Sequence, residues 1–120
     1  MNRLPDTLKE VDRVEIVTLI DNYVDVLLTD TDVVTRPPHA AGEEFLRDTL
    51  VAEHGLSLLI TVYRGPKTHT ILFDTGYSQI GVPHNIALLG IQIQRIEAIV
   101  LSHAHMDHTG SLHKILDGIQ

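Results

Sequence analysis

The chain has 120 residues, of which 43% are apolar, and a formal net charge of −7 with its eight histidines neutral. That is enough for one small domain or for part of a larger one. The acidic balance and the lack of a Lys/Arg cluster argue against nucleic acid as a partner. No apolar run approaches the ~18 residues of a membrane span. Cysteine is absent, which excludes disulfides and thiolate metal ligands. Because the N-terminal segment also lacks the apolar stretch of a signal peptide, we expect a cytoplasmic protein without membrane contact.

The first predicted element is a strand over residues 14–20, where β-branched residues begin in alternation. Asp21 and Asn22 end it, as turn formers, with a role in a site left open. Residues 23–42 are harder to interpret, because Pro37 and Pro38 bar a regular helix. A loop of this length in a compact domain is usually a lid or a binding loop. We therefore predict a lid or substrate loop over residues 23–42.

Regular patterns dominate the rest of the chain. Leu46 and Leu50, four residues apart, predict a helix over residues 43–53. Two apolar stretches flanking an Arg-Gly-Pro-Lys turn predict a hairpin. The remaining expected elements are a short helix, a strand and a final amphipathic helix. The ranges for these later elements are 56–63 and 68–73 for the hairpin, 83–89 for the short helix, 96–101 for the strand and 112–119 for the last helix.

Four potential metal ligands lie within six residues directly after the strand at 96–101: His103, His105, Asp107 and His108. In an extended segment, side chains at i and i+2 point the same way, so His103 and His105 can bind one ion. Asp107 and His108 are adjacent, so we expect them to diverge and bind a second ion. Neutral imidazole and carboxylate suit zinc, and also manganese or iron. A polar loop with scattered histidines is the alternative, but it does not explain this density of ligands.

A second polar turn, Asp74-Thr75-Gly76, follows the second strand of the hairpin. An Asp at a strand end has two interpretations, which its sequence leaves open. It can cap the turn, or it can direct a carboxylate towards the metal loop, with Gly76 allowing a close approach.

The pattern His103-x-His105-x-Asp107-His108, on a strand-to-helix loop and preceded by Asp74-Thr75-Gly76, resembles the metallo-β-lactamase superfamily. The stretches Glu53-His54-Gly55-Leu56-Ser57 and Leu101-Ser102-His103 are similar to one branch of it. That branch contains the dihydropterin–ribofuranosylaminobenzene phosphate synthase-like metal-dependent hydrolases. The resemblance implies an α/β (α+β) fold, an αββα sandwich with the metal site at one edge of the paired sheets.

The resemblance also implies roles. His103 and His105 would bind the first of two divalent ions, zinc being favoured, and Asp107 and His108 the second. Asp74 would support the metal loop as an outer-shell residue. A metal-bound hydroxide would attack an ester, amide or phosphoester of a small substrate, for which the branch suggests a pterin-related molecule, with Asp107 also acting on the attacking water. Diiron members have Glu where this chain has His105, which favours zinc-type hydrolysis over oxygen chemistry.

The family's complete site needs three further ligands, and after His108 this chain offers only His113 and Asp117. His113 is five residues from His108, which is not neighbour spacing on a helix, so we expect it on the surface. Residues 1–120 therefore correspond to the N-terminal part of a single domain, with one mainly β layer and an apolar sheet face left uncovered for association. We expect activity only within a complete domain. The alternative is an incomplete, catalytically inactive half-domain that serves metal binding or association. Substrate-binding residues cannot be named from the sequence.

Overall fold

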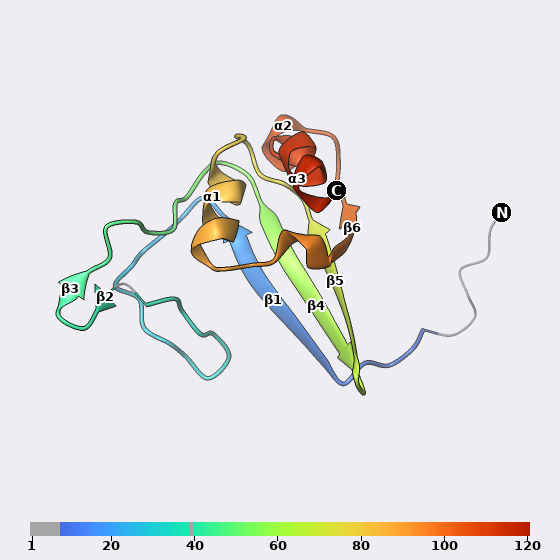
Figure 1. The fold of residues 1–120 in the computed structure, drawn as a ribbon, viewed down its shortest axis with the longest axis horizontal. Coiled ribbons are helices and arrows are strands. Elements are labelled where there is room, and N and C mark those ends of the chain that lie inside the picture. Colours follow the sequence, from blue (N-terminus) through green and yellow to red (C-terminus); the bar gives the residue numbers. More distant parts are fainter. Residues whose placement is uncertain (1–7, 39) are drawn as a thin grey trace.

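The computed structural model describes residues 8–38 and 40–120, which form one four-stranded sheet with helices on one side (Figure 1). The strand order is β1-β4-β5-β6. β4 runs antiparallel to both β1 and β5, and β6 runs parallel to β5. The sheet consists of β1 (Arg13–Ile20), β4 (Ser57–Arg64), β5 (Lys67–Phe73) and β6 (Ile96–Val100), and the helices are α1 (Gly81–Leu88), η1 (Ile93–Arg95), α2 (Met106–Thr109) and α3 (Leu112–Ile119).

The predicted hairpin is confirmed as β4 and β5, which pair without a break from Leu58↔Phe73 to Arg64↔Lys67. Gly65 allows this tight turn because its φ of 54° lies in the left-handed region. A parallel pair needs a crossover connection, and the chain makes it between β5 and β6 through α1 and η1. Neighbouring parallel strands end at the same edge of the sheet, so the segments after β5 and β6 leave it side by side.

The core lies between the sheet and the helices. Val17, Leu59, Leu72 and Ile99 occupy paired positions across the four strands and so share one face. Leu72 is fully buried there. The helices contribute Val82 and Ile86 of α1 and Ile115 of α3 to the same core. Of the apolar side chains of α3, Ile115 is buried in this core and Ile119 packs against it, whereas Leu116 is exposed.

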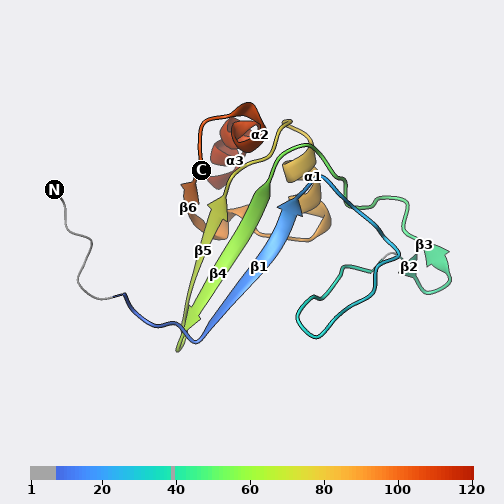
Figure 2. The same ribbon diagram turned by 180° about the vertical axis from the view of Figure 1, so that it is seen from behind.

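The opposite face of the sheet is also apolar. Ile16, Ile60, Ile71 and Ala98 are paired across the four strands on this side. Ile16 is 58% exposed, and Figure 2 shows the helices all lying behind the sheet when this side is viewed. Among the described residues, no helix covers this surface, which we call the open sheet face. Association through this face stays a prediction.

The helix predicted for residues 43–53 is wrong. This stretch contains only β3 (Glu44–Phe45), paired with β2 (Ala40–Ala41), and is otherwise irregular. The backbone N–H groups that a helix would bond internally have other partners. Val51 N donates to Asn85 Oδ1 at 3.0 Å, and Glu53 N donates to Asp21 O at 3.1 Å. Tertiary hydrogen bonds therefore outweigh the weak helical spacing of two leucines.

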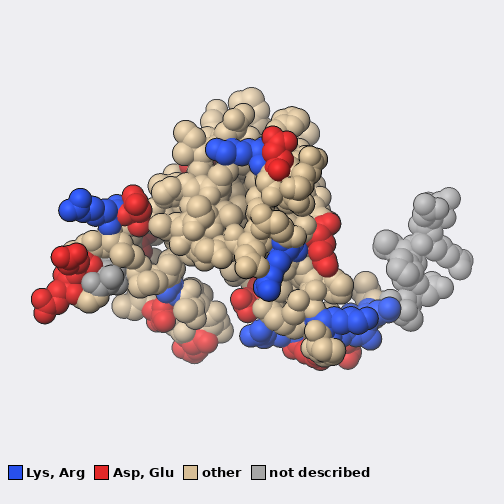
Figure 3. Space-filling model, in the orientation of Figure 1, with Lys and Arg blue, Asp and Glu red and all other residues tan. Residues whose placement is uncertain are grey.

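The chain between β1 and β4 projects away from the sheet as a long excursion (Figure 1). Apart from residue 39, which lies outside the described residues, the stretch predicted as a lid has no regular element before β2. Its role as a lid or substrate loop stays a prediction. Charged side chains of both signs lie on this excursion and at the hairpin end of the sheet, whereas the helical part carries few on the face shown in Figure 3. No helix in the described part of the chain is long and apolar enough to cross a membrane.

Candidate metal centre

The site is built where β5 and β6 end. Asp74 follows β5, and its N–H donates to the carbonyl of Val100, the last residue of β6, at 2.9 Å. The loop that carries His103 and His105 begins one residue later. The sheet register therefore places the Asp74 turn and the metal loop beside each other, although they are far apart in the sequence.

The Asp74 carboxylate is fully buried and points into the metal loop. Its Oδ1 accepts from Ser102 N at 2.7 Å, and its Oδ2 accepts from Ser102 Oγ at 2.7 Å and from His108 Nδ1 at 2.6 Å. The backbone of Asp74 has a φ of 57°, a left-handed conformation that Asp tolerates better than most residues. Of the two interpretations left open by the sequence, the structure shows the carboxylate directed towards the metal loop.

Two opposing influences set the pKa of Asp74. Burial raises it, whereas the hydrogen bonds from Ser102 and His108 and the Coulomb attraction of His108 lower it. The net result is a pKa below the ordinary value, because three donors stabilise the ionised carboxylate. Asp74 is therefore a charged, fixed acceptor at neutral pH.

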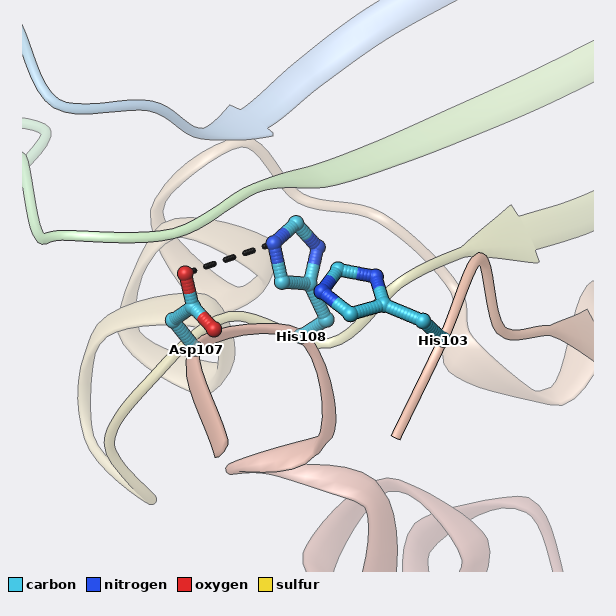
Figure 4. A group of neighbouring side chains, drawn as sticks. All are labelled: His103, Asp107 and His108. Carbon is cyan, nitrogen blue, oxygen red and sulfur yellow. Dashed lines mark ion pairs between the residues drawn. The ribbon is translucent and has the colours of Figure 1, made fainter. Parts of the chain in front are cut away.

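That acceptor decides which nitrogen of His108 faces the site. With Nδ1 bonded to Asp74, the free Nε2 lies 3.3 Å from Asp107 Oδ2 (Figure 4). The expectation that Asp107 and His108 diverge is corrected here. Both belong to the short helix α2, and Asp74 holds the His108 ring on a side that the Asp107 carboxylate also reaches. A histidine whose second nitrogen bonds a carboxylate is the usual arrangement of a metal ligand.

Three of the four motif residues converge. One ligand atom from each of His103, Asp107 and His108 lies within 4.8 Å of the others, and Figure 4 shows their side chains directed towards one another. His105 is outside this group, but its ring is 4.6 Å from that of His103, centroid to centroid. Two imidazoles and a carboxylate are suitable donors for a divalent ion such as zinc. The grouping differs from the predicted pairs, and the assignment of ligands to individual ions stays a prediction.

Backbone hydrogen bonds fix the loops around this cluster. Thr75 N donates to His108 O at 2.7 Å, and Gly110 N donates to Gly76 O at 2.8 Å. Gly110 has no room for a side chain, because a Cβ there would overlap the Tyr77 carbonyl. The two turns are thus locked together by their main chains, and the ligand side chains start from a rigid frame.

Two residues near the site were not assigned to it from the sequence. Ser102 donates twice to Asp74, and His54 places its Nε2 3.2 Å from Asp107 Oδ2. In the sequence, His54 stood out only as part of the stretch similar to the family branch. The feature of the sequence that could have pointed to His54 is the glycine that follows it. Gly55 lies so close to the Asp107 carbonyl that a Cβ there would overlap it. His113 is exposed on α3, as predicted.

Comparison with known proteins defines the class. Residues 50–119 match the family model described as "Metallo-beta-lactamase superfamily". This match covers more than half of the chain and includes the hairpin, the Asp74 turn and the whole metal motif. The chain therefore belongs to the metallo-beta-lactamase superfamily, and its four-stranded sheet with helices on one side is consistent with part of that fold.

Within this class, the chain is similar to a named enzyme. It is 43% identical over 68 residues to the 7,8-dihydropterin-6-methyl-4-(beta-D-ribofuranosyl)-aminobenzene-5'-phosphate synthase of Methanocaldococcus jannaschii. The aligned part covers 57% of this chain and 23% of that relative. This likeness confirms the branch resemblance inferred from the sequence. The chain spans less than a quarter of the curated relative's length.

Proposed function

We propose that this chain supplies part of the active site of a metal-dependent hydrolase, which acts on an ester, amide or phosphoester bond of a small molecule. The observation that carries the proposal is the convergence of His103, Asp107 and His108, with His108 oriented by the buried carboxylate of Asp74. Isolated surface histidines do not require a buried charged partner. An oriented imidazole beside a carboxylate is what a metal centre requires.

In this proposal His103, His105, Asp107 and His108 are the metal ligands and Asp74 is their outer-shell support. Divalent ions, when bound, lower the pKa of a coordinated water to about 7 and so supply a nucleophile at neutral pH. Asp107 has a second role. Its carboxylate is partly exposed, with 22% of the side chain accessible, so it can accept a hydrogen bond from the attacking water and orient it. The three clustered donors and His105 leave each of two ions short of the three protein ligands usual for zinc.

A second candidate is a half-domain that serves metal binding or association without turnover. The open sheet face supports it, because large exposed apolar surfaces mark sites of association. In the first candidate, residues 1–120 are part of a domain whose other ligands come from elsewhere. The two candidates differ in turnover, not in the metal ligands.

The substrate class rests on the named relative. A small, pterin-related substrate is our proposal for this chain, and the excursion over residues 23–42 is the segment we propose to contact it. No role for nucleic acid or a membrane is proposed. The cytoplasmic location stays a prediction, which fractionation of cells expressing the protein would test.

The deciding experiment measures metal content by mass spectrometry and hydrolysis of generic esters and phosphodiesters, in wild type, Asp107→Asn and His113→Ala. We expect zinc in the wild type, turnover when the remaining ligands are present, and loss of turnover in Asp107→Asn. His113→Ala is the matched control, since it removes an exposed imidazole close in sequence to the motif. Full metal content with full turnover in Asp107→Asn would rule out its proposed role. One tightly held ion or none, without turnover even when the remaining ligands are supplied, favours the half-domain.

A further inference from the structure

His54 reaches the metal centre from a different part of the chain, the loop that precedes β4. Its Nε2 lies 3.2 Å from Asp107 Oδ2. The same oxygen is 3.3 Å from His108 Nε2. One carboxylate oxygen of Asp107 therefore has an imidazole nitrogen on either side, of which only the His108 nitrogen belongs to the metal motif.

The main chain around His54 is fixed against α2. Leu56 N donates to Asp107 O at 3.3 Å, so the two segments are joined directly. Gly55 has a φ of 119° and approaches the Asp107 carbonyl so closely that a Cβ would overlap it. On its other side, Gly55 N donates to Asn22 Oδ1 at 2.9 Å. The proximity of His54 to Asp107 is therefore imposed by the backbone.

The His54 side chain lies on the solvent side of the cluster. It is 72% exposed, against 22% for Asp107, and its ring meets that of Tyr77 edge-on with the centroids 6.3 Å apart. It is not a member of the group of ligand atoms formed by His103, Asp107 and His108. Its position is that of a partner to a ligand, placed between the Asp107 carboxylate and the solvent.

We propose that His54 is a positioning residue for Asp107. With its proton on Nε2 and the exposed ring turned so that this N–H points at the oxygen, the imidazole donates to Asp107 Oδ2 and thereby holds the carboxylate in one orientation. Outer partners of metal-ligating groups typically change metal affinity by ~10–100-fold. The inference rests on the proposed metal centre, and it concerns a histidine outside the four-residue motif.

The test compares wild type, His54→Phe, His54→Gln and the control His113→Ala by titration with Co²⁺, following affinity and the visible absorption spectrum. Phe keeps a ring against Tyr77 but has no donor, whereas Gln supplies an N–H. We expect Co²⁺ affinity to fall about 10–100-fold in His54→Phe with a changed spectrum, recovery of most of the affinity in His54→Gln, and no change in His113→Ala.

Each other outcome overturns the inference. Unchanged affinity and spectrum in His54→Phe would show that Asp107 needs no partner. Equal losses in His54→Phe and His54→Gln would show that a donor at this position is not what matters. Absence of Co²⁺ binding by the wild type would remove the metal centre itself, and with it the proposed function. Unfolding curves in urea check that the exposed substitutions leave the fold intact.

Discussion

Replacing Asp74 by Asn tests how the metal centre is organised. The substitution keeps the shape of the side chain but exchanges one carboxylate oxygen for an NH₂ donor. In the wild type, Oδ2 of Asp74 accepts hydrogen bonds from Ser102 Oγ and from His108 Nδ1. If the amide oxygen keeps the bond from Ser102 N, the NH₂ group faces His108 Nδ1. His108 must then become an acceptor there and carry its proton on Nε2, the nitrogen that faces Asp107.

Two magnitudes follow. Loss of a hydrogen bond to a charged acceptor lowers the free energy of unfolding of the metal-free protein by about 1.5–3 kcal/mol. The changed tautomer places a proton on the proposed ligand atom, and loss of such an outer partner lowers metal affinity ~10–100-fold, or about 1.4–2.8 kcal/mol. The reverse amide orientation is no better, because it leaves the part-buried Ser102 N–H facing a donor, at about 1 kcal/mol or more.

The assay combines urea unfolding in chelator with zinc affinity measured by competition against a chromophoric chelator. NMR of the imidazole nitrogens reports the His108 tautomer directly. Ser57→Ala is the matched control. Ser57 is buried and donates to the Asp74 carbonyl at 2.8 Å, so its loss costs about 1 kcal/mol of stability without touching the carboxylate. Wild-type zinc affinity in Asp74→Asn, or an Nδ1–H retained on His108, would refute the reasoning.

Three further predictions concern stability and association. The pKa of Asp74 is lowered in the folded protein, so its ionised carboxylate stabilises the fold above pH about 4, and this contribution is lost as the pH falls through the folded pKa. Between pH 6 and 3, the metal-free wild type should therefore lose more stability than Asp74→Asn in urea titrations. Parallel curves of stability against pH for the two proteins would contradict this. Gly55→Ala should cost about 2 kcal/mol or more and lower zinc affinity, because its Cβ overlaps the Asp107 carbonyl. Gly65→Ala, also at positive φ but in open space, should cost about 1 kcal/mol and leave zinc affinity unchanged. Ile16→Lys should reduce concentration-dependent association through the open sheet face in sedimentation velocity, with stability changed by less than about 0.5 kcal/mol, and unchanged association would exclude Ile16 from the contact.

Local patterns predicted most of the regular structure. The hairpin of β4 and β5 follows from two apolar stretches around Gly65, and α3 follows from apolar residues at helical spacing. The wrong helix over residues 43–53 had only two leucines to support it. What replaced it, the bonds from Val51 to Asn85 and from Glu53 to Asp21, joins residues whose proximity exists only after folding.

The candidate site was likewise predictable from the sequence only in part. The four motif residues are visible because they are contiguous, but their grouping is not. The sequence paired His103 with His105, whereas the structure brings His103 to Asp107 and His108. The difference arises from Asp74, which turns the His108 ring through a contact between two loops. His54 could not be assigned to the site from the sequence, since its contact with Asp107 depends on how the chain enters β4.

The excursion between β1 and β4 also bears on how proteins of this design can diversify. Its ends are held by the sheet, since Ile20 pairs with Ser57, so its interior sequence is free of the strand register. The entropy of closing a flexible loop grows only with the logarithm of its length, and a doubling costs about 0.6 kcal/mol. Insertions and deletions within residues 23–48 are therefore thermodynamically inexpensive, and new sequence can be added there without disturbing the loops that hold Asp74 and the metal motif. The end of the excursion is not free in this way, because Gly55 and Leu56 lie against Asp107.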